Sequence, residues 1–171
     1  MSPKIEDPYI LCLKMDAVSL QRLSAWRKQY FPPERNFLEA HLTLYHRLPF
    51  TATQLILSTL KTFAQNQLVF PLSFEELTHQ GGFLGIKAAP SEVLQVKGAL
   101  DRAFDLWLAP QDRQKIMPHV TVMNNAPPEA TGEALRLLKQ EFAPWQGRAE
   151  GLQLFRYRQG PWEWVADFLF Q

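Results

Sequence analysis

The sequence predicts an α+β fold that contains the same lobe twice, and three observations lead to this expectation. The pattern His41-Leu42-Thr43-Leu44 returns as His119-Val120-Thr121-Val122, with the same residue types at the same offsets. Each copy is preceded and followed by a segment in which apolar residues recur at helical spacing. The chain of 171 residues is long enough to give each copy its own share of a core. We therefore expect residues 1–171 to form a single domain of two pseudo-symmetric lobes.

In the first half, the apolar run 9–13 predicts a buried strand, and Asp16 is a candidate N-cap for a helix that ends at Tyr30. A connection over 34–40 leads to a strand over 41–47. Thr51 or Thr53 is expected to cap the next helix, which extends through Phe63. Two further strands are expected, one over 68–77, broken at Pro71, and its candidate hairpin partner over 83–88.

The second half repeats this order of parts. Ser91 is expected to cap a helix that ends near Pro110, and a polar connection over 111–115 leads to the strand that begins at His119. Another helix is expected after Pro127-Pro128, at the spacing of Leu135, Leu138 and Phe142. Two aromatic-rich strands, 149–157 and 162–170, close the chain. Their Trp and Phe side chains belong either to the core or to a partner surface, and we expect the core.

Composition and charge limit the partners. With 46% hydrophobic and 20% charged residues, the chain is typical of a globular protein. Its formal charge of +1 excludes the strong field that long DNA or an anionic membrane would require, so a small nucleotide or an RNA end fits better. The single Cys12 cannot form an internal disulfide, and neither an apolar leader nor a long apolar run is present. We expect a soluble, cytoplasmic monomer.

The repeated pattern places chemistry on one face of each strand. Side chains alternate along a strand, so His41 and Thr43 share one face, and His119 and Thr121 share the equivalent face of the second copy. A duplicated lobe would bring the two faces together across a cleft. A lone histidine in a strand is usually structural, and only the recurrence of the whole pattern favours catalysis.

Two histidines and two threonines are suited to phosphodiester hydrolysis. That reaction needs a base to activate water, an acid to protonate the leaving oxygen, and donors to the phosphoryl oxygens. A histidine, with an ordinary pKa of about 6.5, can serve as either acid or base, and a threonine hydroxyl can donate a hydrogen bond. We therefore expect His41 and His119 to be catalytic, with Thr43 and Thr121 binding the phosphate.

The two H-x-T-x motifs resemble those of the 2H phosphoesterase superfamily, which includes 2′-5′ RNA ligase-like proteins and RNA 2′,3′-cyclic phosphodiesterases. The aromatic tail over 152–164 is also similar to the closing hairpin of ligase-like members. The resemblance implies a bilobal fold, with antiparallel sheets flanked by helices and a central cleft, and metal-independent hydrolysis, most often of a 2′,3′-cyclic phosphate. It also implies that His41 is the acid and His119 the base, an order that the residues themselves leave open.

Three further residues are candidates for substrate binding. Tyr45 shares the face of His41 by parity, so it either lines the cleft or is a partly buried strand residue. Phe83 follows Gly81-Gly82 and either stacks on a base or packs in the core. Arg156 alternates with apolar neighbours and either reaches a phosphate or is simply solvated.

Alternatives from other classes are weaker. A zinc site could combine His41 and His119 with His46 or His79, but no metal-binding spacing such as H-E-x-x-H or C-x-x-C is present, so His46 and His79 are expected at the surface or in supporting positions. No Walker or dinucleotide fingerprint occurs, and we expect no cofactor. The remaining alternative to an enzyme is a module that binds a nucleotide or RNA end without turnover.

Overall fold

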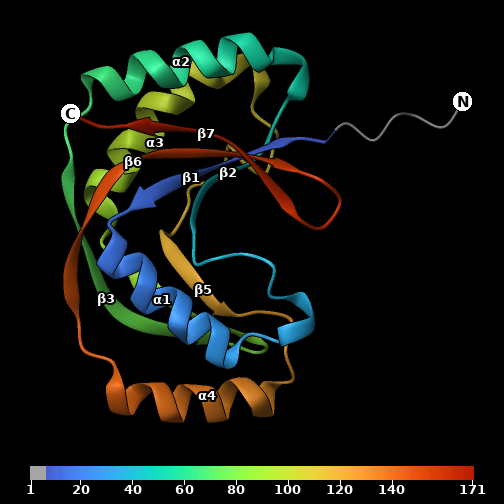
Figure 1. The fold of residues 1–171 in the computed structure, drawn as a ribbon, viewed down its shortest axis with the longest axis vertical. Coiled ribbons are helices and arrows are strands. Elements are labelled where there is room, and N and C mark those ends of the chain that lie inside the picture. The colour runs from blue at the N-terminus through green and yellow to red at the C-terminus, as the bar shows by residue number, and fades with distance from the viewer. Residues whose placement is uncertain (1–6) are drawn as a thin grey trace, which may run out of the picture.

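The computed structural model describes residues 7–171, which form one sheet flanked by four α-helices (Figure 1). The strands are β1 (Tyr9–Met15), β2 (Leu42–Leu48), β3 (Phe70–Gln80), β4 (Phe83–Ala88), β5 (His119–Met123), β6 (Trp145–Tyr157) and β7 (Trp162–Leu169). The α-helices are α1 (Ala17–Tyr30), α2 (Thr53–Asn66), α3 (Pro90–Phe104) and α4 (Pro128–Glu141). The predicted α+β class is confirmed.

The sheet is antiparallel throughout its paired strands, in the order β2-β1-β6-β3-β4-β5, and β7 pairs with β6. The element order β1-α1-β2-α2-β3 recurs as β4-α3-β5-α4-β6. In this repeat, β1, β2 and β3 correspond to β4, β5 and β6. If each strand is exchanged with its counterpart, the sheet order read from the opposite end is the same as before. This symmetry supports the predicted single domain of two lobes, which we keep as our interpretation.

The crossing helices and the curved sheet bring the two halves together. Helix α1, from the first half, packs against β5 of the second half, and Tyr45 of β2 donates a hydrogen bond to the carbonyl of Lys97 in α3 (3.1 Å). The end strands β2 and β5 contact each other although they lie at opposite ends of the sheet order. Figure 1 shows α2 and α4 at opposite ends of the molecule, with α1 between them. The strands that carry the two motifs therefore meet at the centre.

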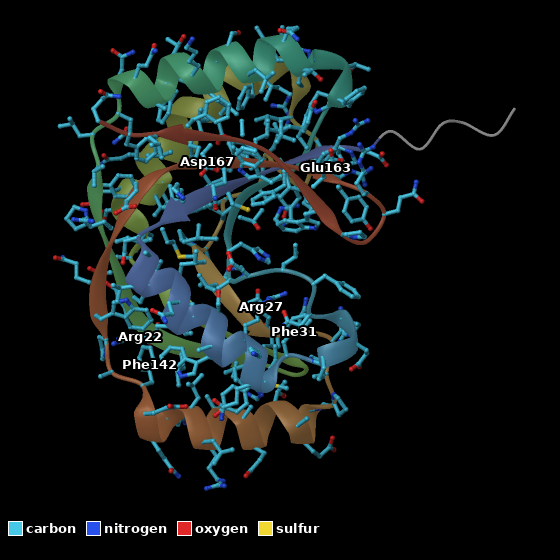
Figure 2. The ribbon with its side chains drawn as sticks, in the orientation of Figure 1. Arg22, Arg27, Phe31, Phe142, Glu163 and Asp167 are labelled. Carbon is cyan, nitrogen blue, oxygen red and sulfur yellow. The ribbon has the colours of Figure 1, made fainter. Side chains whose placement is uncertain are left out.

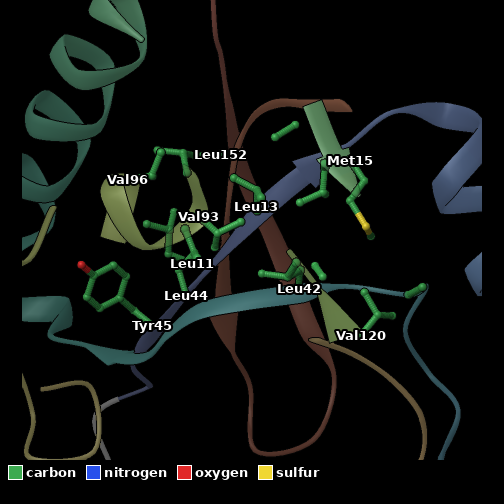
Figure 3. Packing of buried hydrophobic residues seen from close by; sticks show 14 of the residues in the cluster. Leu11, Leu13, Met15, Leu42, Leu44, Tyr45, Val93, Val96, Val120 and Leu152 are labelled. Carbon is green, nitrogen blue, oxygen red and sulfur yellow. The ribbon is translucent and has the colours of Figure 1, made fainter. Parts of the chain in front are cut away.

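The core is continuous through both halves. Figure 3 shows side chains of β1 and β2, including Leu11, Leu13, Leu42 and Leu44, packed with Val93 of α3, and all five are essentially inaccessible to water. Strand β1 is apolar at almost every position because other elements cover both of its faces. None of the helices in residues 7–171 has both the length and the apolar character of a membrane span.

Some predicted boundaries are wrong for simple reasons. Asp16 caps α1 as expected, since its Oδ1 accepts a hydrogen bond from the Ser19 amide (3.0 Å). Thr53 and Ser91 instead lie inside their helices, because an alanine occupies each N-cap position. Pro71 does not break β3, which continues through it opposite Arg148.

The aromatic residues of the closing strands are not all in the core. Phe170 is buried as expected, but Trp164 is largely exposed and Trp162 reaches the cleft described below. The prediction of a core role was wrong for these two tryptophans, because both line cavities that open to solvent.

Candidate active site

A cleft of about 360 Å³ lies where β2 and β5 meet, and it brings together the four residues that the motifs predicted. His41, which immediately precedes β2, and Thr43 come from the first half; His119 and Thr121 of β5 come from the second. The other lining residues are His46, Phe83, Ile116, Met117, Asn124 and Trp162. The cleft is therefore built from residues of both halves.

Both histidine rings are oriented in the same way. Nδ1 of His41 lies 2.9 Å from the carbonyl oxygen of Glu39, and Nδ1 of His119 lies 2.7 Å from that of Met117. A carbonyl oxygen only accepts, so each Nδ1 carries a proton and donates it. Each Nε2 is then left to accept a proton or, once protonated, to give one away. This is the arrangement that a pair of acid and base catalysts requires.

Aromatic side chains pack on both histidine rings. The ring of Trp162 lies 4.6 Å from that of His41, and Phe83 makes an edge contact with His119 at 5.5 Å between centroids. Phe83, expected either on a base or in the core, therefore lines the cleft.

The pKa of His41 is lowered to about 4. Burial is the main cause, because it disfavours the charged form, and the charge of Arg27 and the nearby imidazoles of His119 and His46 act in the same direction. The hydrogen bond to Glu39 opposes them only in part. His41 is therefore neutral in the free protein at pH 7.

Arg27 is a buried cation behind the cleft, which sequence reasoning missed. Its Nε donates to Oδ1 of Asn36 (3.0 Å) and to the carbonyl of Leu38 (3.2 Å), while Nη1 donates to the carbonyl of Thr121 (3.1 Å). Burial lowers its pKa to about 10, so it stays charged at neutral pH. Within residues 7–171 it forms no ion pair with a carboxylate. Arg27 thus ties the segment before His41 to strand β5 and adds positive potential.

The side chain of Thr43 contacts the chain's one cysteine, Cys12, on the neighbouring strand β1. The Cys12 sulfur lies 3.8 Å from Thr43 Oγ1, and burial raises the pKa of the Cys12 thiol to about 12. Cys12 is therefore a neutral, buried neighbour of Thr43. Its hydrogen bond to Thr43 is weak, and the hydroxyl can turn toward a ligand in the cleft.

Tyr45 does not line the cleft, so that prediction was wrong. Its side chain is fully buried, and its hydroxyl donates to Oδ1 of Asp101 (2.7 Å). The register between β1 and β2 shifts between the pairs Cys12–Thr43 and Leu11–Tyr45, which makes Leu44 an extra residue on β2. This bulge breaks the alternation and turns Leu44 and Tyr45 into the core together.

The same irregularity turns His46 toward the cleft. It lines the cavity, and its backbone N–H donates to Oδ1 of the buried Asp112 (2.8 Å). Burial on its own would raise the pKa of Asp112, but hydrogen bonds from His46 and from the amide of Arg47 lower it overall. A buried carboxylate in the supposed polar connection therefore anchors the end of β2, a role that composition alone did not reveal.

Two other candidates lie outside the cleft. Arg156 packs its guanidinium over the ring of Phe50 (3.9 Å) near Asp7, so the expectation that it reaches a phosphate in the cleft was wrong. It alternates with Phe155, which faces the opposite side of β6. His79 contacts Thr131 (3.2 Å between Nε2 and Oγ1), away from the other histidines. In the described part of the chain, no three His, Cys, Asp or Glu side chains are grouped to hold a metal ion.

Comparison with known proteins identifies one matching family and several similar structures. The model of the 2′-5′ RNA ligase superfamily matches residues 16–161, whereas no curated protein is detectably similar in sequence. The structure of TT0787 from Thermus thermophilus is similar with a TM-score of 0.66 at 14% identity, over 95% of this chain and 97% of that one. E. coli LigT complexed with 3′-AMP gives 0.62 at 15% identity, over 97% and 99% of the two chains. LigT complexed with NADP⁺ gives a TM-score of 0.62 at 16% identity, over 96% of this chain and 98% of that one.

Proposed function

Because the chain belongs to the 2′-5′ RNA ligase superfamily, a group of phosphoesterases, we propose that it hydrolyses cyclic or 2′-5′ phosphodiesters of RNA ends or small nucleotides without a metal ion. A 2′,3′-cyclic phosphate is the substrate we favour. One observation carries the proposal: two histidines from opposite halves share one cleft, each has Nδ1 bound to a carbonyl, and neither Nε2 has a hydrogen-bond partner within residues 7–171. Binding alone would need donors, but not two groups that can exchange protons.

The proposed reaction uses both rings at once. Nε2 of His119 takes a proton from water as the water oxygen bonds to phosphorus, and Nε2 of His41 gives a proton to the ester oxygen that leaves. A cyclic phosphate is opened in this way to a monoester and a free hydroxyl. The hydroxyls of Thr43 and Thr121 donate to the non-bridging oxygens, where negative charge is concentrated.

The charge on the substrate explains how His41 can be the acid. In the free protein its lowered pKa keeps it neutral, mainly because it is buried and in part because Arg27 disfavours a second positive charge beside it. A phosphodiester anion in the cleft offsets the charge of Arg27 and favours the protonated ring. His41 is therefore protonated more readily when substrate is bound, and the protonated ring can give its proton to the leaving oxygen.

The walls of the cleft suit a nucleotide. Phe83 and Trp162 present aromatic surface beside the two histidines, on which a base can stack. The similar LigT was crystallised with 3′-AMP, NADP⁺ and ATP, each of which joins a base to phosphate. These ligands support a small nucleotide or RNA end as the partner here.

Product analysis in excess EDTA tests the proposal. Nucleoside 2′,3′-cyclic phosphates and 2′-5′ dinucleotides are incubated with the wild type, His41→Ala and His119→Ala. We expect turnover by the wild type and a loss of about 10²- to 10⁴-fold in each variant, the usual value of general acid or base catalysis. Loss of wild-type activity in EDTA with recovery in zinc would contradict the metal-independent mechanism. Binding without any product would instead identify a binding module.

A further inference from the structure

A second cavity of about 280 Å³ lies beside the cleft and shares two of its residues, His41 and Trp162. One wall is formed by residues 37–40, and the other by Gln153 and Phe155 of β6 with Trp164 of β7. We call this cavity the aromatic slot. Because His41 and Trp162 line both spaces, a ligand held at His41 can extend into the slot without leaving the protein surface.

The slot has two aromatic side chains that are exposed but held in place. Phe37 is 68% exposed and Trp164 is 59% exposed, which is unusual for such large apolar groups. The indole Nε1 of Trp164 donates to Oδ1 of Asp167 (2.9 Å), a residue labelled on β7 in Figure 2. Hydrogen bonds from Arg27 hold the residues on either side of Phe37. A flat ligand could stack on these rings at little cost in side-chain entropy.

The charges in the slot indicate which part of a nucleotide it would take. Among residues 7–171, no lysine or arginine lines it, and Glu39 places a carboxylate there, so phosphate groups and acidic side chains are disfavoured. Glu39 and the side-chain oxygen of Gln153 can accept hydrogen bonds from the edge of a base, while aromatic faces attract the flat faces of bases of any sequence. The slot is therefore suited to a nucleobase.

We propose that the aromatic slot binds the second nucleobase of the substrate, so that the protein acts on a dinucleotide or an RNA end in preference to a single nucleotide. This inference rests on the proposed function. The reacting phosphodiester lies between His41 and His119, one nucleoside occupies the cleft near Phe83, and the neighbouring base lies past Trp162 in the slot.

Kinetics with matched substrates test the slot. The wild type, Phe37→Ala and Trp164→Ala are compared on adenosine 2′,3′-cyclic phosphate, on ApA ending in the same cyclic phosphate, and on 2′-5′ ApA. We expect the two slot variants to raise KM for two-base substrates by about tenfold or more, the effect of losing one stacking contact, and to leave the one-base substrate unaffected. Trp107→Ala, another exposed tryptophan but outside both cavities, is the matched control.

Calorimetry separates a failure of the slot from a failure of the proposed reaction. His119→Ala protein is titrated with 2′-5′ ApA and with AMP. The same titrations are repeated with a double variant that carries both His119→Ala and Trp164→Ala. Tighter binding of ApA that is lost with Trp164→Ala supports the slot even if no substrate is turned over. Equal affinity for one- and two-base ligands, or equal effects of the slot variants on all substrates, would overturn it and leave the surface as a contact for another protein.

Discussion

The two motif histidines have the same hydrogen bond to a carbonyl but different surroundings. His41 is half-buried beneath Trp162 and close to Arg27, whereas His119 is exposed and makes an edge contact with Phe83. Burial and neighbouring positive charge lower the pKa of His41 to about 4. Identical motifs can therefore be assigned different roles, because the residues around His41 lower its pKa and disfavour its charged form.

The titration of His41 should depend on an anion in the cleft. In ring NMR spectra of the free protein we expect a midpoint near 4, and inorganic phosphate or AMP should raise it by about 1 to 3 units because an opposite charge favours the protonated ring. Since the bound state has the higher pKa, binding takes up a proton, and phosphate affinity falls as pH rises through that raised value. His41→Gln assigns the signal. A midpoint that does not move with phosphate would contradict the proposed acid role.

Tyr45 and Thr43 give a test of which residues face the substrate. Thr43→Val keeps the shape but removes the hydroxyl, and we expect kcat to fall by about 10²- to 10³-fold, as for the loss of a donor to a developing oxyanion. Tyr45→Phe should leave kcat within about twofold, since the hydroxyl's partners Lys97 and Asp101 do not line the cleft. It should lower the free energy of unfolding by about 1 kcal/mol per hydrogen bond lost. Urea unfolding and steady-state kinetics measure both. A large loss of kcat in Tyr45→Phe would contradict this placement.

At the scale of elements, Arg27 joins three of them. It belongs to α1, it binds the segment that leads into His41 through Asn36 and Leu38, and it binds β5 through the carbonyl of Thr121. The planar guanidinium reaches all three acceptors at once, which the single ammonium of a lysine does not. Arg27 is thus a positioning residue with two separable properties, its shape and its charge.

Two substitutions separate those properties. Arg27→Lys and Arg27→Met should both lower kcat/KM by about 10- to 100-fold, because small displacements of catalytic groups are costly. Only Arg27→Met should raise the pKa of His41, since it alone removes a charge that lowers it. Arg22→Met, on the exposed side of the same helix (Figure 2), is the control and should change neither quantity. An unchanged pKa of His41 in Arg27→Met, measured by NMR, would refute the electrostatic role.

Sequence periodicity predicted most of the elements and the four motif residues, since these depend on local patterns. It misplaced Tyr45 because a bulge depends on how β2 pairs with β1, which no local pattern records. Arg27 had a usable signal: it lies on the buried stripe of α1 with Ser19, Leu23 and Trp26, at helical spacing, where a cation is unusual. The part played by Trp162 had no such signal, because it depends on where the last hairpin folds back.

At the scale of the whole molecule, neither half can be complete without the other. Helix α1 of the first half packs against β5, α3 of the second half is bonded to β2, and the two halves each supply one histidine to the cleft. The β3–β4 turn at Gly81-Gly82 separates the two repeats of the element order, and both sides of this turn are anchored to the second half. Thr131 donates to the carbonyl of Gly81 (2.6 Å), and the Ala126 amide donates to that of Gly82 (3.2 Å).

Cutting the chain between Gly81 and Gly82 tests this interdependence. Each fragment alone would expose an apolar face that the other normally covers, so we expect neither to show the near-ultraviolet circular dichroism of a packed core. Mixing them should restore both the spectrum and phosphodiesterase activity, because the cut removes no side chain and leaves both ends beside their hydrogen-bonding partners. A first fragment carrying His41→Ala is the control, since it should restore the spectrum but not the activity. If either fragment folded alone, the lobes would be independent units, and the crossing of α1 and α3 between them would not be what holds the two catalytic strands together.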